Sequence, residues 1–208
     1  MGRYTGPVEK LSRREGVELF LKGERALNGK SALERRGDAP PGQHGQARRR
    51  KPSIYQTQLR AKQTAKRYYG IREGQFRRYV QKANRARGVT GEELLNLLER
   101  RLDNVVVRLG FAASRRQARQ LIGHGHFMVN GRRVNKPSYQ LRPGEVISVS
   151  DTSGARGVIS EATELTATVP AWLQADYDSL TAKVLRLPER EEIATPVQEQ
   201  LIVELYSK

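Results

Sequence analysis

Residues 101–134 read RLDNVVVRLGFAASRRQARQLIGHGHFMVNGRRV and carry the strongest local folding signals in the chain. Ser114 is placed to cap a helix over residues 115–123, because its hydroxyl can accept a hydrogen bond from an amide of the first turn. Asn130-Gly131 follows between two strand-like runs, and this dipeptide favours a tight hairpin turn. The stretch therefore predicts a short helix followed by a β-hairpin over residues 127–134.

The predicted helix over residues 115–123 is amphipathic. At about 100° per residue, its arginines share one side, while Ala118 and Leu121 lie on the other. Helix N-termini and forked guanidinium groups both suit phosphate oxygens. We therefore predict a phosphate-binding arginine face, for which an ordinary solvated helix face is the alternative. If these arginines serve only RNA, alanine at Arg115 and Arg119 should weaken RNA binding and leave the thermal midpoint nearly unchanged.

The segments on both sides enlarge this unit to residues 99–150. Before it, Thr90-Gly91-Glu92-Glu93 fits the capping-box pattern and introduces apolar residues at steps of three or four, with a break expected near Arg100-Arg101. After it, Pro143-Gly144 marks a turn before an alternating strand over residues 145–149. Residues 99–150 thus predict two helical stretches and a small antiparallel sheet.

Two further helices are predicted upstream of this unit. Ser53 is placed to cap the first, which ends at Gly70, and the second spans residues 73–87. In both, basic residues alternate with apolar ones, so each helix has one side for a core and one for phosphates. Their aromatic side chains can stack on bases, but the helical spacing favours core packing; they are Tyr68, Tyr69, Phe76 and Tyr79.

The two ends of the chain complete an α+β prediction. Residues 1–50 lack a sustained apolar period, so we expect a basic arm that is extended and ordered mainly on RNA, with at most a short helix near residues 12–20. A change of composition over residues 151–170 indicates a domain boundary. The predicted domains are the arm (1–50), a mostly helical body with the C-terminal tail (51–98 with 151–208), and an inserted RNA-binding domain (99–150).

Charge identifies the class of partner. The 208 residues carry a net charge of +16, distributed as +6 over residues 1–50, +8 over 51–98, +7 over 99–150 and −5 over 151–208. Such an excess requires a polyanion, and the acidic last quarter is expected to face water or a basic protein. No run of about 18 apolar residues and no signal peptide is found. We therefore expect a soluble, cytoplasmic nucleic-acid-binding protein without a membrane anchor.

Metal and acid-base chemistry have weak support. The chain has no cysteine, which excludes disulfides, Cys-based metal sites and thiol nucleophiles. His124 and His126 sit in a glycine-flanked turn, and His44 lies far away in the arm without a carboxylate cluster. We expect all three to be RNA contacts or turn residues. No cofactor and no metal are predicted.

Motifs throughout the chain resemble one known family. The run Arg101–Phe111, the segment Ser114–Leu121, His124-Gly125-His126 and Val129-Asn130-Gly131 resemble the RNA-binding domain of the bacterial small-subunit ribosomal protein S4 family. Outside that domain, Gly2-Arg3-Tyr4, Gly6-Pro7, Pro41–Gly45, Leu187-Pro188, Pro196-Val197 and Glu199–Leu201 fall where the family has similar residues. The resemblance therefore covers nearly the whole chain.

The resemblance implies a specific function and specific partners. Members bind 16S ribosomal RNA directly at a multi-helix junction, nucleate assembly, and contact ribosomal proteins S5 and S3 near the mRNA entry channel, with effects on translational accuracy. It implies no homo-oligomer in the particle. Many similar proteins hold zinc with four N-terminal cysteines, and the matching positions here are Glu9, Ser12, Ala26 and Ser31, so this chain is expected to be a zinc-free form.

The candidate RNA-binding residues come from all three basic regions. They are Arg3, Gln43, His44, Arg48, Arg49, Arg50 and Lys51 in the arm; Arg60, Lys62, Lys66, Arg67 and Arg72 in the helices; and Ser114, Arg115, Arg116, Gln117, Arg119, His124 and Arg132 in the small domain.

Two other functions are compatible with parts of the chain. An RNA-modifying enzyme, or another RNA-binding factor, can use the same small domain, but an enzyme needs a separate catalytic domain for which no stretch remains, and P-loop and dinucleotide-binding motifs are absent. A DNA-binding architectural protein is disfavoured because no dimer signal and no recognition helix is found.

Overall fold

The computed structural model describes residues 4–37, 39–47, 51–165 and 168–207, apart from the side chains of Ala26 and Leu27. The chain divides into two compact units. The first contains residues 1–94 and 195–208, and the second contains residues 95–194. Because each unit has its own core, each is described by itself.

The N-terminal arm in the first unit is folded, which corrects the prediction of an extended segment. It forms the short helices α1 (Glu9–Glu15), α2 (Glu24–Leu27) and α3 (Ala32–Arg36). Val8 and Leu19 are buried, and the Ser31 hydroxyl caps α3 by accepting from the Glu34 amide at 3.3 Å. Scattered apolar residues and local caps therefore order this segment without a periodic apolar stripe.

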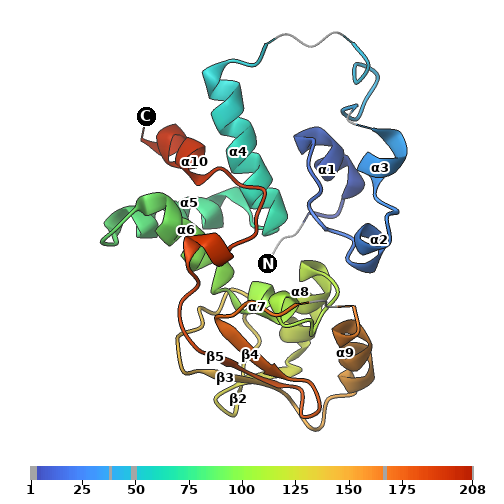
Figure 1. Cartoon of the computed structure of the whole chain (residues 1–208), viewed down its shortest axis with the longest axis vertical. Helices are drawn as coiled ribbons and strands as arrows, with labels where there is room; N and C mark the ends of the chain where they lie inside the picture. The colour runs from blue at the N-terminus through green and yellow to red at the C-terminus, as the bar shows by residue number, and fades with distance from the viewer. Residues whose placement is uncertain (1–3, 38, 48–50, 166–167, 208) are drawn as a thin grey trace. The chain divides into compact units, whose positions relative to one another are not determined.

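The helical part of the first unit follows the predicted pattern. It contains α4 (Ile54–Tyr68), α5 (Glu73–Arg85), the first half of α6 (Thr90–Glu99) and the C-terminal α10 (Glu199–Tyr206). Ser53 caps α4 by accepting from the Gln56 amide, and Gly70, at φ 61°, ends the helix region. The helix α10 packs beside α4 (Figure 1), where Gln58 Nε2 donates to Glu204 Oε2 at 3.0 Å.

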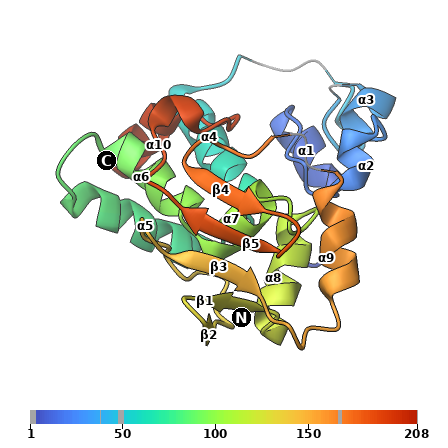
Figure 2. The same ribbon diagram turned by 60° about the horizontal axis from the view of Figure 1, so that its bottom comes forward.

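The second unit is a small sheet covered by helices. Its elements are α7 (Leu102–Arg108), α8 (Arg115–His124), β1 (Phe127–Val129), β2 (Arg132–Arg133), β3 (Val146–Val149), α9 (Arg156–Thr163), β4 (Leu173–Asp176), β5 (Thr181–Val184) and a 3₁₀ turn, Arg190–Glu192. The strands pair in the order β2-β1-β3-β5-β4, and every pair is antiparallel (Figure 2). Alternate strand residues such as Ile147 and Val149 are buried in the core of this unit.

The hairpin prediction is confirmed in detail. Asn130 and Gly131 have φ values of 49° and 74°, and a turn of this kind requires positive φ at both positions. Met128 then pairs with Arg133 and Val129 with Arg132. The predicted break near residue 100 is also present, because α6 ends at Glu99 and α7 begins at Leu102.

The domain limits in the structure differ from those predicted at residue 150. Residues 151–194 belong to the second unit, because β5 pairs with β3 and because Ile159 and Trp172 are buried in the same core as Phe127. Only residues 195–208 join the helical unit. The strands β4 and β5 are short and partly polar, so their sequence gives little sign that they extend the sheet.

Candidate nucleic-acid interface

The helix α8 carries the arginines that the sequence singled out. Ser114 caps it by accepting from the Gln117 amide, and the Gln117 side chain in turn accepts from the Ala113 amide at 2.8 Å. Arg116 is exposed, whereas Arg115 is 9% exposed and Arg119 is partly buried. Ser114 and Gln117 therefore stabilise the helix end, and the arginine face is only partly open to solvent.

Two consecutive polar residues of α7 hold the buried arginines. Arg115 Nε donates to Asn104 Oδ1 at 2.9 Å, and Arg119 Nε donates to Asp103 Oδ2 at 2.7 Å. Arg101 donates to both oxygens of the same Asp103 carboxylate, at 2.9 and 2.7 Å. Contrary to the expectation that Arg115 and Arg119 serve only RNA, both are part of the internal structure of this unit.

A second carboxylate continues this network. Glu99 is 1% exposed and accepts from Arg108 at 3.0 and 2.9 Å, in a two-pronged geometry. It also accepts from Asn104 Nδ2 at 2.5 Å. Asn104 therefore connects Glu99 with Arg115, so that the buried charges of α6, α7 and α8 are mutually satisfied.

The hairpin is fastened to the end of α8 by Arg133, an arginine outside the predicted set. It donates from Nε to the Gly125 carbonyl at 2.9 Å and from Nη2 to the His124 carbonyl at 2.7 Å. Arg132 and the His124 side chain are exposed. Carbonyls at the C-terminal end of a helix accept readily from a cation, and this fixes the hairpin next to α8.

The predicted cations of α4 are paired with carboxylates. Arg60 Nη1 lies 3.2 Å from Glu15 Oε1, and Arg67 also donates to this carboxylate. Lys62 and Lys66 each donate to Glu73 at 3.0 Å. These four side chains thus tie α4 to α1 and α5, and two carboxylates compensate half of their positive charge.

The pairing is reflected in the pKa values. Burial raises the pKa of Glu73, but hydrogen bonds from Lys66, Lys62 and Tyr206 outweigh it and lower the pKa to about 2. Burial and the hydrogen bond to Glu73 raise the pKa of Tyr206. Burial also lowers the pKa of Arg67, although Glu15 acts in the opposite direction.

A group of exposed cations in the first unit lies on α5. Its buried residues Phe76, Tyr79, Val80 and Ala83 occupy one side, and the other side exposes Arg77, Arg78, Lys82 and Arg85, with Arg72 at the start and Arg87 just beyond the end. Among the described residues, no ion pair joins any of these six to a carboxylate. We call these six the α5 cation face. Only Arg72 was selected from the sequence.

The structure describes three of the seven RNA-binding candidates in the arm. Gln43 and His44 are exposed and lie side by side, with 3.1 Å between Gln43 Nε2 and His44 Nε2, and Lys51 is exposed. Arg3, Arg48, Arg49 and Arg50 lie outside the described residues.

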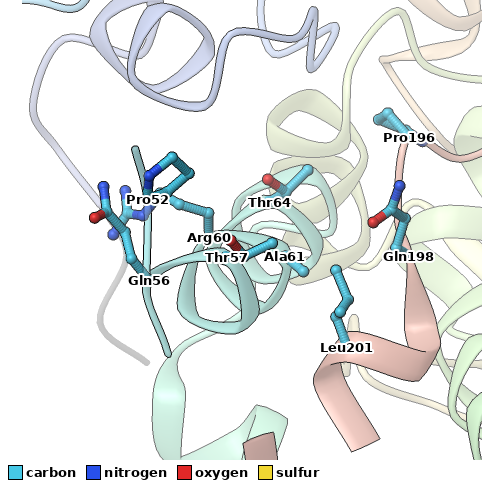
Figure 3. Close-up of a pocket in the computed structure, with 9 residues that line it drawn as sticks. All are labelled: Pro52, Gln56, Thr57, Arg60, Ala61, Thr64, Pro196, Gln198 and Leu201. Atoms are coloured by element: carbon cyan, nitrogen blue, oxygen red, sulfur yellow. The ribbon is translucent and has the colours of Figure 1, made fainter. Parts of the chain in front are cut away.

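The first unit also contains a groove between α4 and the segment that leads into α10 (Figure 3). Its volume is about 320 Å³. It is lined by Pro52, Gln56, Thr57, Arg60, Ala61, Thr64, Pro196, Gln198 and Leu201. Arg60 is the charged residue in this lining, and it is paired with Glu15.

The histidines and the arm offer no metal site in the described part of the chain, where no group of three His, Asp or Glu side chains is arranged to hold an ion. His126 Nδ1 lies 2.8 Å from Ser153 Oγ, and its ring is 6.1 Å from that of His124. Of the positions matched to zinc ligands, Glu9 accepts from the Ala32 amide at 3.0 Å and Ser12 is buried. No helix in the described ranges is long and apolar enough to cross a membrane.

Several residues that build the interface were missed from the sequence. Glu15, Glu99 and Asp103 hold arginines, but acidic residues in a basic chain are usually solvated, and nothing local distinguishes these three. The α5 cation face had a usable signal, because its basic residues fall opposite the apolar ones at helical spacing.

The chain is similar over its whole length to proteins of one known family. Residues 3–99 match the family model described as the ribosomal protein S4/S9 N-terminal domain, and residues 100–147 match that of the S4 domain. The chain is 59% identical to the small ribosomal subunit protein uS4A of Symbiobacterium thermophilum. It is 55% identical to the uS4 proteins of Natranaerobius thermophilus and Thermus thermophilus. Each alignment covers 100% of both chains.

Proposed function

Because the chain belongs to the family of the small ribosomal subunit protein uS4, we propose that it binds small-subunit ribosomal RNA directly as a structural component of that subunit. The observation that carries the proposal is the α5 cation face, which is exposed and has no carboxylate partner among the described residues. Such a face suits the phosphate backbone of a folded RNA, which contributes most of the binding affinity.

Both units contribute to the proposed RNA surface. In the first unit it comprises the α5 cation face, the exposed edge of Arg60 and Arg67, and the arm residues Gln43, His44 and Lys51. In the second unit it comprises Arg116, the exposed parts of Arg108 and Arg119, His124 and Arg132. Arg3, Arg48, Arg49 and Arg50 are included on their charge alone.

The finer assignments rest on the family resemblance. The protein nucleates assembly around 16S ribosomal RNA, contacts ribosomal proteins S5 and S3, and lies near the mRNA entry channel in the cytoplasmic ribosome, where it influences translational accuracy. The acidic exposed residues of the second unit, among them Asp176, Asp178 and Glu191, support a protein-facing side, since they repel RNA.

An RNA-modifying enzyme is not favoured. The two family models match residues 3–147, and neither describes a catalytic domain. The close relatives named above are ribosomal proteins.

Filter binding across a range of salt concentrations tests the proposal. The probes are small-subunit ribosomal RNA, a double-stranded RNA of unrelated sequence and a DNA duplex, all at equal length. We expect the ribosomal RNA to be preferred at every salt concentration, with affinity for all three falling as salt rises. Equal affinity for ribosomal and unrelated RNA would sink the proposal.

A further inference from the structure

Two classes of basic side chain differ in their carboxylate partners. In the first unit, Glu15 has a side chain with 0% exposure, and it accepts from Arg60, Arg67 and the Thr64 hydroxyl. Arg60 and Arg67 are themselves 33% and 21% exposed. A buried carboxylate thus fixes the position of both guanidinium groups, while part of each side chain is exposed to solvent.

The same construction occurs twice in the second unit. Asp103, 1% exposed, holds Arg119, whose side chain is 26% exposed. Glu99, also 1% exposed, holds Arg108, whose side chain is 20% exposed. We call these four arginines, Arg60, Arg67, Arg108 and Arg119, the anchored arginines.

The α5 cation face has the opposite construction. Arg77, Arg78, Lys82 and Arg85 are exposed, and no carboxylate among the described residues pairs with them. Their charge is uncompensated, and their long side chains retain the rotamer freedom that a fixed contact would remove. The two classes therefore differ in both net charge and order.

We propose that the anchored arginines recognise the shape of the folded ribosomal RNA, and that the α5 cation face supplies attraction to any RNA. This deepens the function proposed above and rests on it. Glu15 and Asp103 are positioning residues in this division, because they act on RNA only through the arginines that they hold.

The physical basis is the difference between charge and geometry. An arginine whose charge is partly compensated by a carboxylate attracts phosphates less strongly at long range, but its fixed fork loses little entropy when it meets a phosphate in the matching place. An uncompensated, mobile cation displaces counterions from any phosphate and imposes no geometry. Anchored arginines should therefore affect selectivity, and the α5 cation face should affect the salt dependence.

The substitution Glu15→Gln separates attraction from recognition, because it should change the affinities for unrelated RNA and for ribosomal RNA differently. It removes a negative charge, so affinity for unrelated double-stranded RNA should stay the same or rise. It also releases Arg60 and Arg67, so affinity for small-subunit ribosomal RNA should fall about tenfold, as expected when a charge-assisted hydrogen bond is removed. Filter binding of the full chain to both RNAs measures the ratio, and the thermal midpoint shows whether the variant is folded.

Two further variants complete the test. Arg60→Lys keeps the charge and removes the fork, so it should lower selectivity without changing the salt slope, even if Glu15→Gln fails to fold. The matched control Arg77→Ala with Arg78→Ala should weaken binding to both RNAs equally. It should also reduce the salt slope by about one unit for each phosphate that the two arginines no longer neutralise.

The outcomes are distinct. Parallel changes for both RNAs in Arg60→Lys, or a selective loss in the α5 double variant, would overturn the division between the two classes. Wild-type protein that does not prefer ribosomal RNA would instead refute the proposed function itself.

Discussion

The Asp103 carboxylate, in the first turn of α7, accepts a hydrogen bond of 2.7 Å from Arg119 Nε in α8. The same carboxylate accepts from Arg101, whose side chain is 3% exposed. One buried anion therefore holds two cations and joins two helices. Its removal should have consequences that a surface ion pair would not have.

Replacement of Asp103 by alanine should cost about 3 to 5 kcal/mol, because Arg101 and part of Arg119 would remain buried without their anion. Urea unfolding of the full chain measures the loss. The control is Asp151→Ala, whose side chain is 94% exposed in its pair with Arg156 and whose removal should change stability by less than about 0.5 kcal/mol. Similar losses in both variants would contradict the role given to Asp103.

Replacement of Arg115 by alanine should destabilise the protein by about 1 to 3 kcal/mol, because the buried Asn104 oxygen loses its donor. Arg132→Ala, on the exposed strand β2, should leave stability nearly unchanged. Thermal unfolding of the two variants compares them. An unchanged midpoint for Arg115→Ala would restore the view that this arginine serves RNA alone.

Acid should weaken the first unit through Glu73. Its pKa is lowered from 4.5 to about 2 in the folded protein, so its contribution to stability is complete above pH 4.5 and is lost as the pH falls towards 2. Glu73→Gln removes that contribution, so the wild-type and variant thermal midpoints should converge between pH 4.5 and 2. Glu161→Gln, an exposed position on α9, should show no such convergence.

The arm should depend on its local caps. Ser31→Ala removes the hydroxyl that caps α3 and should cost about 1 kcal/mol of helix stability. The expected result is faster limited proteolysis within residues 9–37 at an unchanged rate of cleavage elsewhere. Ser31→Thr retains a capping hydroxyl and serves as the control, so equal acceleration in both variants would argue against the cap.

Local signals in the sequence predicted the elements well. Ser53 and Ser114 cap the helices that follow them, and Asn130-Gly131 forms the hairpin turn, because each of these residues acts through its own neighbours in the chain. The membership of residues 151–194 in the second unit was missed, since pairing of β5 with β3 joins segments that are more than thirty residues apart. The four residues of β5 show no sequence pattern that predicts pairing with β3.

The sequence predicted where basic residues lie on the helices, but it did not predict which side chains they contact. Arginines were rightly placed on one side of α8, but charge alone does not reveal that Asn104 and Asp103 lie beneath them. Likewise, the α4 cations were expected to face phosphate, and Glu15 and Glu73 are brought to them only by tertiary packing. Whether these residues contact RNA stays a prediction.

The order of strands and helices has a consequence for biosynthesis. The strand β5 inserts between β3 and β4, and α10 covers α4, so both units are completed by segments from late in the chain. A nascent polypeptide that stops before Thr181 leaves the edge of β3 unpaired, and one that stops before Glu199 leaves the side of α4 that α10 covers exposed. Synthesis must therefore pass β4 and β5 before the second core is buried and must pass α10 before the first is, and shorter products expose apolar surface that favours aggregation.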